Sequence, residues 1–172
     1  MKKVIALILL MALSFMLCAC GKKTETVTAS DQSKFTWQIQ VSNAEVKDKL
    51  HTDEGIAQYD GGISDVAHDN TPAEGNSFVI LTLTVTKAQA GGGSFDWKKL
   101  SLKDADGNSY SRMENDSFLS SHTYKRMPGT ALQIGENKGS ICFEIPEKAA
   151  SGSLTLCYDA GDEGVNTTPL NK

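Results

Sequence analysis

Alternating apolar and polar residues mark the first folded segment of the chain. In the stretch FTWQIQVS, the apolar residues Phe35, Trp37, Ile39 and Val41 alternate with polar residues. A period of two is typical of a β-strand with one buried face. The segment 76–89, NSFVILTLTVTKAQ, is the most β-prone of the chain, but its apolar residues do not keep one parity. It predicts a strand that contains a bulge or is buried on both faces.

Shorter apolar stretches follow, and turn residues such as Pro128-Gly129 separate them. Further strands are predicted around residues 100–102, 132–134, 141–145 and 154–158, with a return strand that begins at Tyr110. Residues 161–172 carry no such pattern and are expected to be a loose tail. Several short strands separated by turns, without an internal repeat or an amphipathic helix, favour an all-β fold. We expect an antiparallel β-sandwich over residues 35–160.

Two polar segments interrupt the strands. Residues 47–77 are rich in Asp, Glu, Gly and Asn, which predicts a mobile loop or a loop with a short strand near 56–59. Residues 111–127 carry three candidate binding residues, His122, Tyr124 and Arg126. Tyr and Arg are enriched at interfaces, and loops on a rigid sheet commonly carry binding residues. We expect both segments at one end of the sandwich, where they form a contact surface; an ordinary polar loop is the alternative.

The chain begins with the pattern of an exported lipoprotein. Lys2 and Lys3 precede an apolar run from Val4 to Leu17, which is shorter than the ~20 residues that a membrane-spanning helix needs. The run ends in LCAC, which resembles the bacterial lipobox. That resemblance implies cleavage before Cys20 and acylation of its thiol and its new amino group. The alternative is an ordinary secretory signal that has cysteines near its end by chance.

This interpretation divides the chain into a signal peptide (1–19), a lipidated flexible tether (20–34), a folded domain (35–160) and a tail (161–172). It places the protein at the cell membrane, anchored by lipid at Cys20 and facing the extracytoplasmic side. Several acyl chains hold firmly, since each buried CH₂ contributes about 0.8 kcal/mol. Loss of the two N-terminal lysines changes the formal net charge from −4 to −6. A nucleic-acid partner is therefore not expected, because phosphates require a basic face.

Two cysteines lie on the predicted strands 141–145 and 154–158. In an antiparallel hairpin of these strands, the register that aligns the apolar residues also places Cys142 opposite Cys157, on the outer face. Opposed Cβ atoms are about 4.5–5.5 Å apart and a disulfide needs nearer 3.8 Å, so the bond requires local adjustment. An exported protein can keep such a disulfide. The alternative is that both cysteines are inert thiols. A zinc site would need further His or Cys ligands, and a catalytic cysteine would need a His partner; neither is found nearby in the sequence.

The turn after residue 103 is a weak candidate for a metal site. Asp104, Asp106 and Asn108 alternate as in a calcium-binding EF-hand loop, but Gly107 stands fourth rather than sixth. A hairpin turn is favoured, in which Asp106-Gly107 supplies the positive φ angles. Trp37 and Trp97 suit either sugar stacking or core packing, and their parity with apolar residues favours the core. The sequence indicates no cofactor and no catalytic set, so we expect a protein without enzyme activity.

Three stretches together resemble a bacterial family: PAEGNSFVILTLTVTKA (72–88), FDWKKLSLKDADGNSY (95–110) and GSICFEIPEKA (139–149). Its members are usually lipid-anchored domains grouped with the immunoglobulin-like fold of secreted immunoprotective antigens. The resemblance implies one immunoglobulin-like β-sandwich outside the cytoplasm, and it brings no catalytic or ligand residues. The 47–77 segment and the cysteine pair depart from the family pattern. The expected function is binding of a protein or glycan partner at the cell envelope; the alternative is binding of a small ligand or cation.

Overall fold

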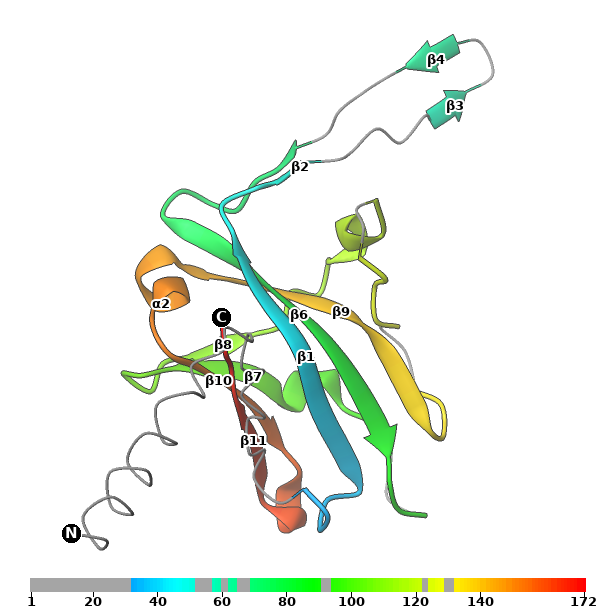
Figure 1. Ribbon diagram of the computed structural model, residues 1–172, viewed down its shortest axis with the longest axis vertical. Helices are drawn as coiled ribbons and strands as arrows, with labels where there is room; N and C mark the ends of the chain where they lie inside the picture. Colours follow the sequence, from blue (N-terminus) through cyan, green and yellow to red (C-terminus); the bar gives the residue numbers. More distant parts are fainter. Residues whose placement is uncertain are drawn as a thin grey trace, which may run out of the picture.

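Two antiparallel β-sheets form the body of the protein (Figure 1). The computed structural model describes residues 32–51, 57–59, 62–64, 69–90, 94–121, 124–128 and 132–172. The three-stranded sheet has the order β1 (Trp37–Lys47), β6 (Asn76–Lys87) and β9 (Glu136–Pro146). The four-stranded sheet has the order β11 (Val165–Pro169), β10 (Leu154–Asp159), β7 (Leu100–Asp104) and β8 (Ser109–Ser111).

Short elements connect these strands. Two small strand pairs lie within the 47–77 segment: β2 (Leu50–His51) with β5 (Asp69–Asn70), and β3 (Ala57–Tyr59) with β4 (Gly62–Ser64). The helical turns are η1 (Trp97–Lys99), η2 (Ser117–Ser121), α2 (Glu147–Ser151) and η3 (Gly161–Glu163). Within the described ranges, none of the helices has the length and apolar content needed to cross a membrane.

The strand order is that of an immunoglobulin-like domain. In such domains, strands A, B, E and D share one sheet and strands C, F and G share the other, which variable-type domains extend with C′. Here β1, β6 and β9 take the places of A, B and E, and β8, β7, β10 and β11 take those of C′, C, F and G; no described strand of the first sheet takes the place of D. The predicted immunoglobulin-like β-sandwich is confirmed.

The main core lies between the sheets and follows from the alternation in the sequence. Its β9 and β10 members are Ile141, Phe143, Ile145, Leu154, Leu156 and Tyr158. The central strand β6 is buried on both faces, which explains its mixed parity: Val79 and Leu81 enter the main core, whereas Phe78 and Ile80 point away from it. Burial of each large apolar side chain contributes about 1.5–3 kcal/mol, so this core supplies most of the stability.

A second apolar cluster covers the outer face of the three-stranded sheet. It comprises Leu50, Phe78, Ile80, Leu119 and Cys142, with Met113, Phe118 and Tyr124 packed against it. Leu50 belongs to the 47–77 segment and Leu119 to the 111–127 segment, so both segments pack on this cluster. The Tyr124 hydroxyl also donates a hydrogen bond to Glu45 Oε2 of β1 over 3.2 Å. The two segments therefore share one face of a sheet.

The predicted hairpin of strands 141–145 and 154–158 is wrong. β9 pairs with β6, which places Cys142 opposite Ile80. β10 belongs to the other sheet, where Cys157 lies opposite Ser101 and Thr167. The connecting residues form α2, whose Ala150 is buried in the main core, and the chain thereby crosses from one sheet to the other.

The C-terminal segment is ordered, contrary to the prediction of a loose tail at 161–172. β11 pairs with β10 and buries Asn166 and Thr168. Both side chains bond to Gln32, whose Oε1 accepts from Asn166 Nδ2 over 3.1 Å and whose Nε2 donates to Thr168 Oγ1 over 3.3 Å. Because the buried positions of β11 are polar, its sequence shows no alternation of apolar and polar residues.

The predicted strand at residues 132–134 does not form. Ile134 is 90% exposed, and the chain turns at Gly135, whose φ is +93°. β9 begins only at Glu136, one residue beyond that turn. The two apolar residues of this segment, Leu132 and Ile134, therefore belong to the chain that leads into a glycine turn.

Gly139 allows the segment 125–127 to lie against the edge of β9. Ser140 N donates to Lys125 O over 2.7 Å, and Met127 N donates to Ser140 O over 2.8 Å. A Cβ atom on Gly139 would lie 2.7 Å from Met127 Cα, which no side-chain rotation relieves. Close approach of the two backbones therefore requires glycine here.

We predict that Gly139→Ala lowers the free energy of unfolding by about 1–3 kcal/mol, because the added atom displaces backbone. Gly152→Ala is the matched control, since its Cβ would meet Ala149 O at 3.5 Å, an ordinary contact. Urea denaturation measures both variants. Equal losses for the two would contradict the close approach at Gly139.

Candidate functional site

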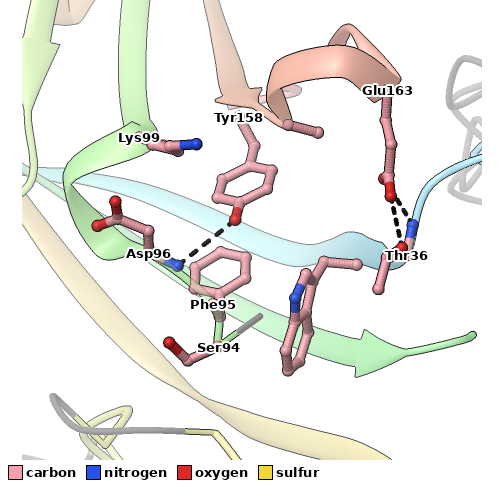
Figure 2. Close-up of a pocket in the computed structure, with 9 residues that line it drawn as sticks. Thr36, Ser94, Phe95, Asp96, Lys99, Tyr158 and Glu163 are labelled. Carbon is pink, nitrogen blue, oxygen red and sulfur yellow. Dashed lines mark hydrogen bonds between the residues drawn. The ribbon is translucent and has the colours of Figure 1, made fainter. Parts of the chain in front are cut away.

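Two cavities open at the surface of the described residues. The first, here called the tyrosine cavity, measures about 480 Å³ and is lined by Thr36, Trp37, Ser94, Phe95, Asp96, Lys99, Tyr158, Ala160 and Glu163 (Figure 2). The second, here called the arginine cavity, measures about 550 Å³ and is lined by Trp97, Lys98, Ser111, Arg112, Met113, Glu114 and Arg126. Both volumes fall in the range of small-molecule sites.

The polar groups that line the tyrosine cavity form hydrogen bonds with one another and with neighbouring backbone. Glu163 accepts hydrogen bonds from Thr36 N over 2.8 Å and from Thr36 Oγ1 over 2.5 Å, and these bonds lower the pKa of its carboxyl group. Asp96 Oδ1 accepts from Lys98 N over 3.0 Å and so caps η1. Figure 2 shows Tyr158 turned toward Asp96, whose backbone N donates to the tyrosine hydroxyl over 3.4 Å.

The aromatic rings of this cavity belong to the core. Phe95 stacks on Tyr158 with ring centroids 4.4 Å apart, and Trp37 meets the edge of Phe95 at 5.5 Å. All three residues are buried, so their ring faces are occupied by one another. The tyrosine cavity is therefore built chiefly for stability, and this agrees with the prediction that Trp37 packs in the core.

The arginine cavity is built around a buried carboxylate. Asp116 has no exposed surface and lies between two arginines. Its Oδ2 accepts from Arg112 Nε over 3.1 Å and from Arg112 Nη2 over 2.8 Å. Its Oδ1 accepts from Arg126 Nε over 2.6 Å. The Arg112 side chain is 7% exposed and that of Arg126 is 31% exposed, so the cluster reaches the cavity mainly through Arg126.

Trp97 completes the wall beside this cluster. The Arg112 guanidinium carbon lies 4.2 Å from the centroid of the Trp97 ring, a cation–π contact. The edge of Phe95 meets Trp97 at 4.7 Å, which connects the indole to the aromatic core. Trp97 Nε1 is buried and makes no hydrogen bond to any described residue. The cavity thus presents the guanidinium N–H groups of Arg126 beside a firmly packed aromatic support.

Three segments that are distant in the sequence bring these residues together. Trp97 begins η1, and Arg112 and Asp116 both precede η2, Asp116 directly. Asp116 O also accepts from Leu119 N over 3.1 Å, which fixes the first turn of η2. Arg126 lies on the segment that forms a parallel bridge with Ser140 at the edge of β9. The basic wall therefore depends on the tertiary fold.

Of the three predicted binding residues, one reaches a cavity. Arg126 lines the arginine cavity. Tyr124 instead packs on the second apolar cluster, where burial raises the pKa of its hydroxyl to about 12 and Glu45 adds to this effect. His122 lies outside the described residues. Sequence reasoning missed Trp97, Arg112 and Asp116 as site residues, although the spacing of an Arg and an Asp by four residues was a usable signal.

The predicted hairpin turn at residues 104–108 is confirmed. Asp104 Oδ1 accepts from Asp106 N over 3.0 Å and from Asn108 N over 2.8 Å, while Oδ2 accepts from the Asn108 side chain and from Tyr110 Oη. These bonds, the Asn108 side chain first, lower the pKa of the Asp104 carboxyl group. Gly107 has a φ of +85°. Both oxygens of Asp104 thus hold the turn, and no described group of three or more His, Cys, Asp or Glu residues has metal-site geometry.

The predicted disulfide between Cys142 and Cys157 is wrong, because both residues are free thiols on strands of different sheets. The prediction did place them correctly on faces that point away from the main core. Neither is solvated, however. Burial raises the pKa of Cys142 from 9.0 to about 12, and burial also raises the pKa of Cys157. Such thiols are poor nucleophiles at neutral pH.

We predict that Cys142 stabilises the fold less as the pH rises above 9. Its thiol ionises near pH 9.0 when unfolded but near pH 12 when folded, so stability is full below pH 9 and is lost as the pH rises toward 12. The stability difference between the wild type and Cys142→Ala should shrink by about 1.4 kcal/mol between pH 8 and pH 10. Urea denaturation at both pH values measures it. A constant difference would show that the thiol is not buried.

Comparison with known proteins adds little to this site. No protein-family model and no curated protein matches the sequence. A crystal structure of an uncharacterized beta-sandwich protein from Clostridium difficile 630, at 1.90 Å resolution, is similar with a TM-score of 0.45 and 12% identity. The match covers 83% of this chain and 87% of that chain. Similarity at this level carries no functional argument, and the β-sandwich assignment depends on the strand order described above.

Proposed function

We propose that the protein is a lipid-anchored binding protein of the cell envelope without enzyme activity. Its anchor is Cys20, its sandwich faces the extracytoplasmic side, and it binds an envelope partner through the arginine cavity. The lipobox-like LCAC segment and the resemblance to a lipid-anchored family support the location. The raised pKa values of both described thiols support a binding role over nucleophilic catalysis.

The arrangement of Asp116 with its two arginines is the observation that carries this proposal. Removing two arginines and a carboxylate from water is costly, and apolar residues of similar size stabilise a core at least as well. Stability alone therefore does not account for the cluster. A cavity that displays N–H donors on an aromatic support does account for it, because partially buried Arg and Trp side chains are typical anchors of binding surfaces.

The location is tested by replacing the lipidated residue. In bacterial cells that process lipoproteins, Cys20→Ala should release most of the protein from the membrane fraction, because the acyl chains are lost. Cys18→Ala is the matched control and should leave the protein in the membrane fraction. Fractionation followed by immunoblotting measures the distribution. Retention of Cys20→Ala in the membrane would contradict the lipid anchor.

Partner binding is tested by photo-crosslinking in the same cells. A photoreactive residue at Ser111, which lines the arginine cavity, should give one defined adduct. The same residue at Lys148, on α2 and outside the lining of that cavity, should not. Absence of an adduct at Ser111, or the same adduct from both positions, would contradict a partner surface at the arginine cavity.

A small free ligand is the second candidate, and the volume of about 550 Å³ favours it. A ligand that binds only the folded protein raises the unfolding temperature. A shift with small envelope metabolites, together with no adduct at Ser111, would favour this second function.

A further inference from the structure

We infer that the arginine cavity binds a single carboxylate, supplied by the C-terminus of a peptide chain, with Arg126 as its hydrogen-bond donor and Trp97 as an apolar wall. This inference rests on the proposed function and specifies the chemistry of the partner. It follows from the charge, the free donors and the apolar lining of the cavity.

The charge balance of the cavity calls for one negative charge. Arg112 and Arg126 carry two positive charges, and Asp116 neutralises one of them. At the lining, Lys98 and Glu114 carry opposite charges and offset each other. The remaining charge is about +1, which a carboxylate neutralises.

The donors of the cavity suit the shape of that group. Arg126 uses Nε for Asp116, so its two terminal nitrogens have no partner among the described residues. A guanidinium presents its N–H groups in a planar fork that matches a carboxylate. The Arg126 side chain is 31% exposed and lines the cavity, so a ligand can reach it.

The rest of the lining points to a peptide end. Trp97 and Met113 place apolar surface beside the donors, so the carboxylate is expected to carry an apolar side chain. Glu114 and the chain's net charge of −4 oppose a polymer with many negative charges. The space of about 550 Å³ accommodates a terminal residue while the preceding chain remains outside.

The test uses the full chain in detergent, with N-acetyl-leucine and its uncharged analogue N-acetyl-leucinamide as probes. The chain has two tryptophans, so two indole N–H signals are expected, and Trp97→Phe assigns one of them to Trp97. N-acetyl-leucine should shift the Trp97 signal saturably, and the amide should bind about 10-fold or more weakly. A pentapeptide that ends in leucine should bind at least as tightly as N-acetyl-leucine.

One variant tests the donor, and a second is its control. Arg126→Gln should weaken N-acetyl-leucine binding by about 10- to 100-fold, as expected for a charged hydrogen bond. Lys99→Gln removes the same charge at the tyrosine cavity and should change binding less than about 2-fold. Thermal unfolding of each variant confirms that it is folded.

Several outcomes would overturn the inference: equal binding of acid and amide, equal effects of Arg126→Gln and Lys99→Gln, or tighter binding of inorganic phosphate or polygalacturonate. Tighter binding of N-acetyl-leucine than of the pentapeptide would overturn the assignment to a peptide end. The proposed function and the carboxylate inference can be refuted independently of each other. An adduct at Ser111 that persists in Arg126→Gln leaves the proposed function standing and removes the carboxylate inference, whereas no adduct in the wild type removes the proposed function.

Discussion

Asp116→Asn should lower the free energy of unfolding by about 3–5 kcal/mol, the usual cost of breaking a buried ion pair by removing one partner. The asparagine has the same shape, so packing is retained while the charge is lost. Arg112, which is 7% exposed, then keeps a buried positive charge without its anion. A domain of this size is stable by only about 5–15 kcal/mol, so the loss is a large share of the total.

Urea denaturation measures this effect, and Asp106→Asn is its matched control. Asp106 lies in the exposed turn before β8, so the same change of charge should cost less than about 0.5 kcal/mol there. A loss below about 1 kcal/mol in Asp116→Asn would show that the two arginines do not depend on this carboxylate.

Phe95→Ala should also lower the free energy of unfolding by about 3–5 kcal/mol. Phe95 joins three aromatic residues: it stacks on Tyr158 and makes edge contacts with Trp37 and Trp97. Its loss leaves a void between the two sheets and removes the support of Trp97, on which Arg112 rests. The variant is therefore expected to disturb the arginine cavity as well as the core.

Phe95→Leu separates these contributions. Leucine fills most of the volume, so the loss should fall to about 1–1.5 kcal/mol, the part that depends on aromatic contacts. Tryptophan fluorescence during urea denaturation reports both the unfolding and the environment of the indole rings. Equal stability of the alanine and leucine variants would contradict a tightly filled site at Phe95.

The strands with apolar alternation could be predicted from the sequence, because one face of each is buried against the other sheet. β1, β9 and β10 follow that rule. β11 could not be predicted in this way, because its buried positions are Asn166 and Thr168 and their hydrogen-bond partner Gln32 is distant in the sequence. A polar residue that is buried through a distant partner leaves no local pattern.

The pairing of strands could not be predicted from neighbouring sequence alone. Two consecutive strands with matching apolar positions are compatible with a hairpin, and that hairpin would align Cys142 with Cys157. In the fold, each strand has better partners elsewhere: β6 for β9, and β7 and β11 for β10. These contacts join residues far apart in the chain, so only the three-dimensional structure reveals them.

The candidate site was only partly predictable for the same reason. Arg126 was recognised by residue type in a polar segment. The parity of Trp97 favours the core, and it does contact the core through Phe95, yet the residue also lines the arginine cavity. The role of Asp116 depends on the fold, which brings Arg126 to it from beyond η2.

A crystal structure of the protein with N-acetyl-leucine tests the central claim most directly. The account predicts the ligand in the arginine cavity, with its carboxylate oxygens about 2.7–3.2 Å from the terminal nitrogens of Arg126. A ligand bound elsewhere, or bound there with its carboxylate turned toward solvent, would contradict it.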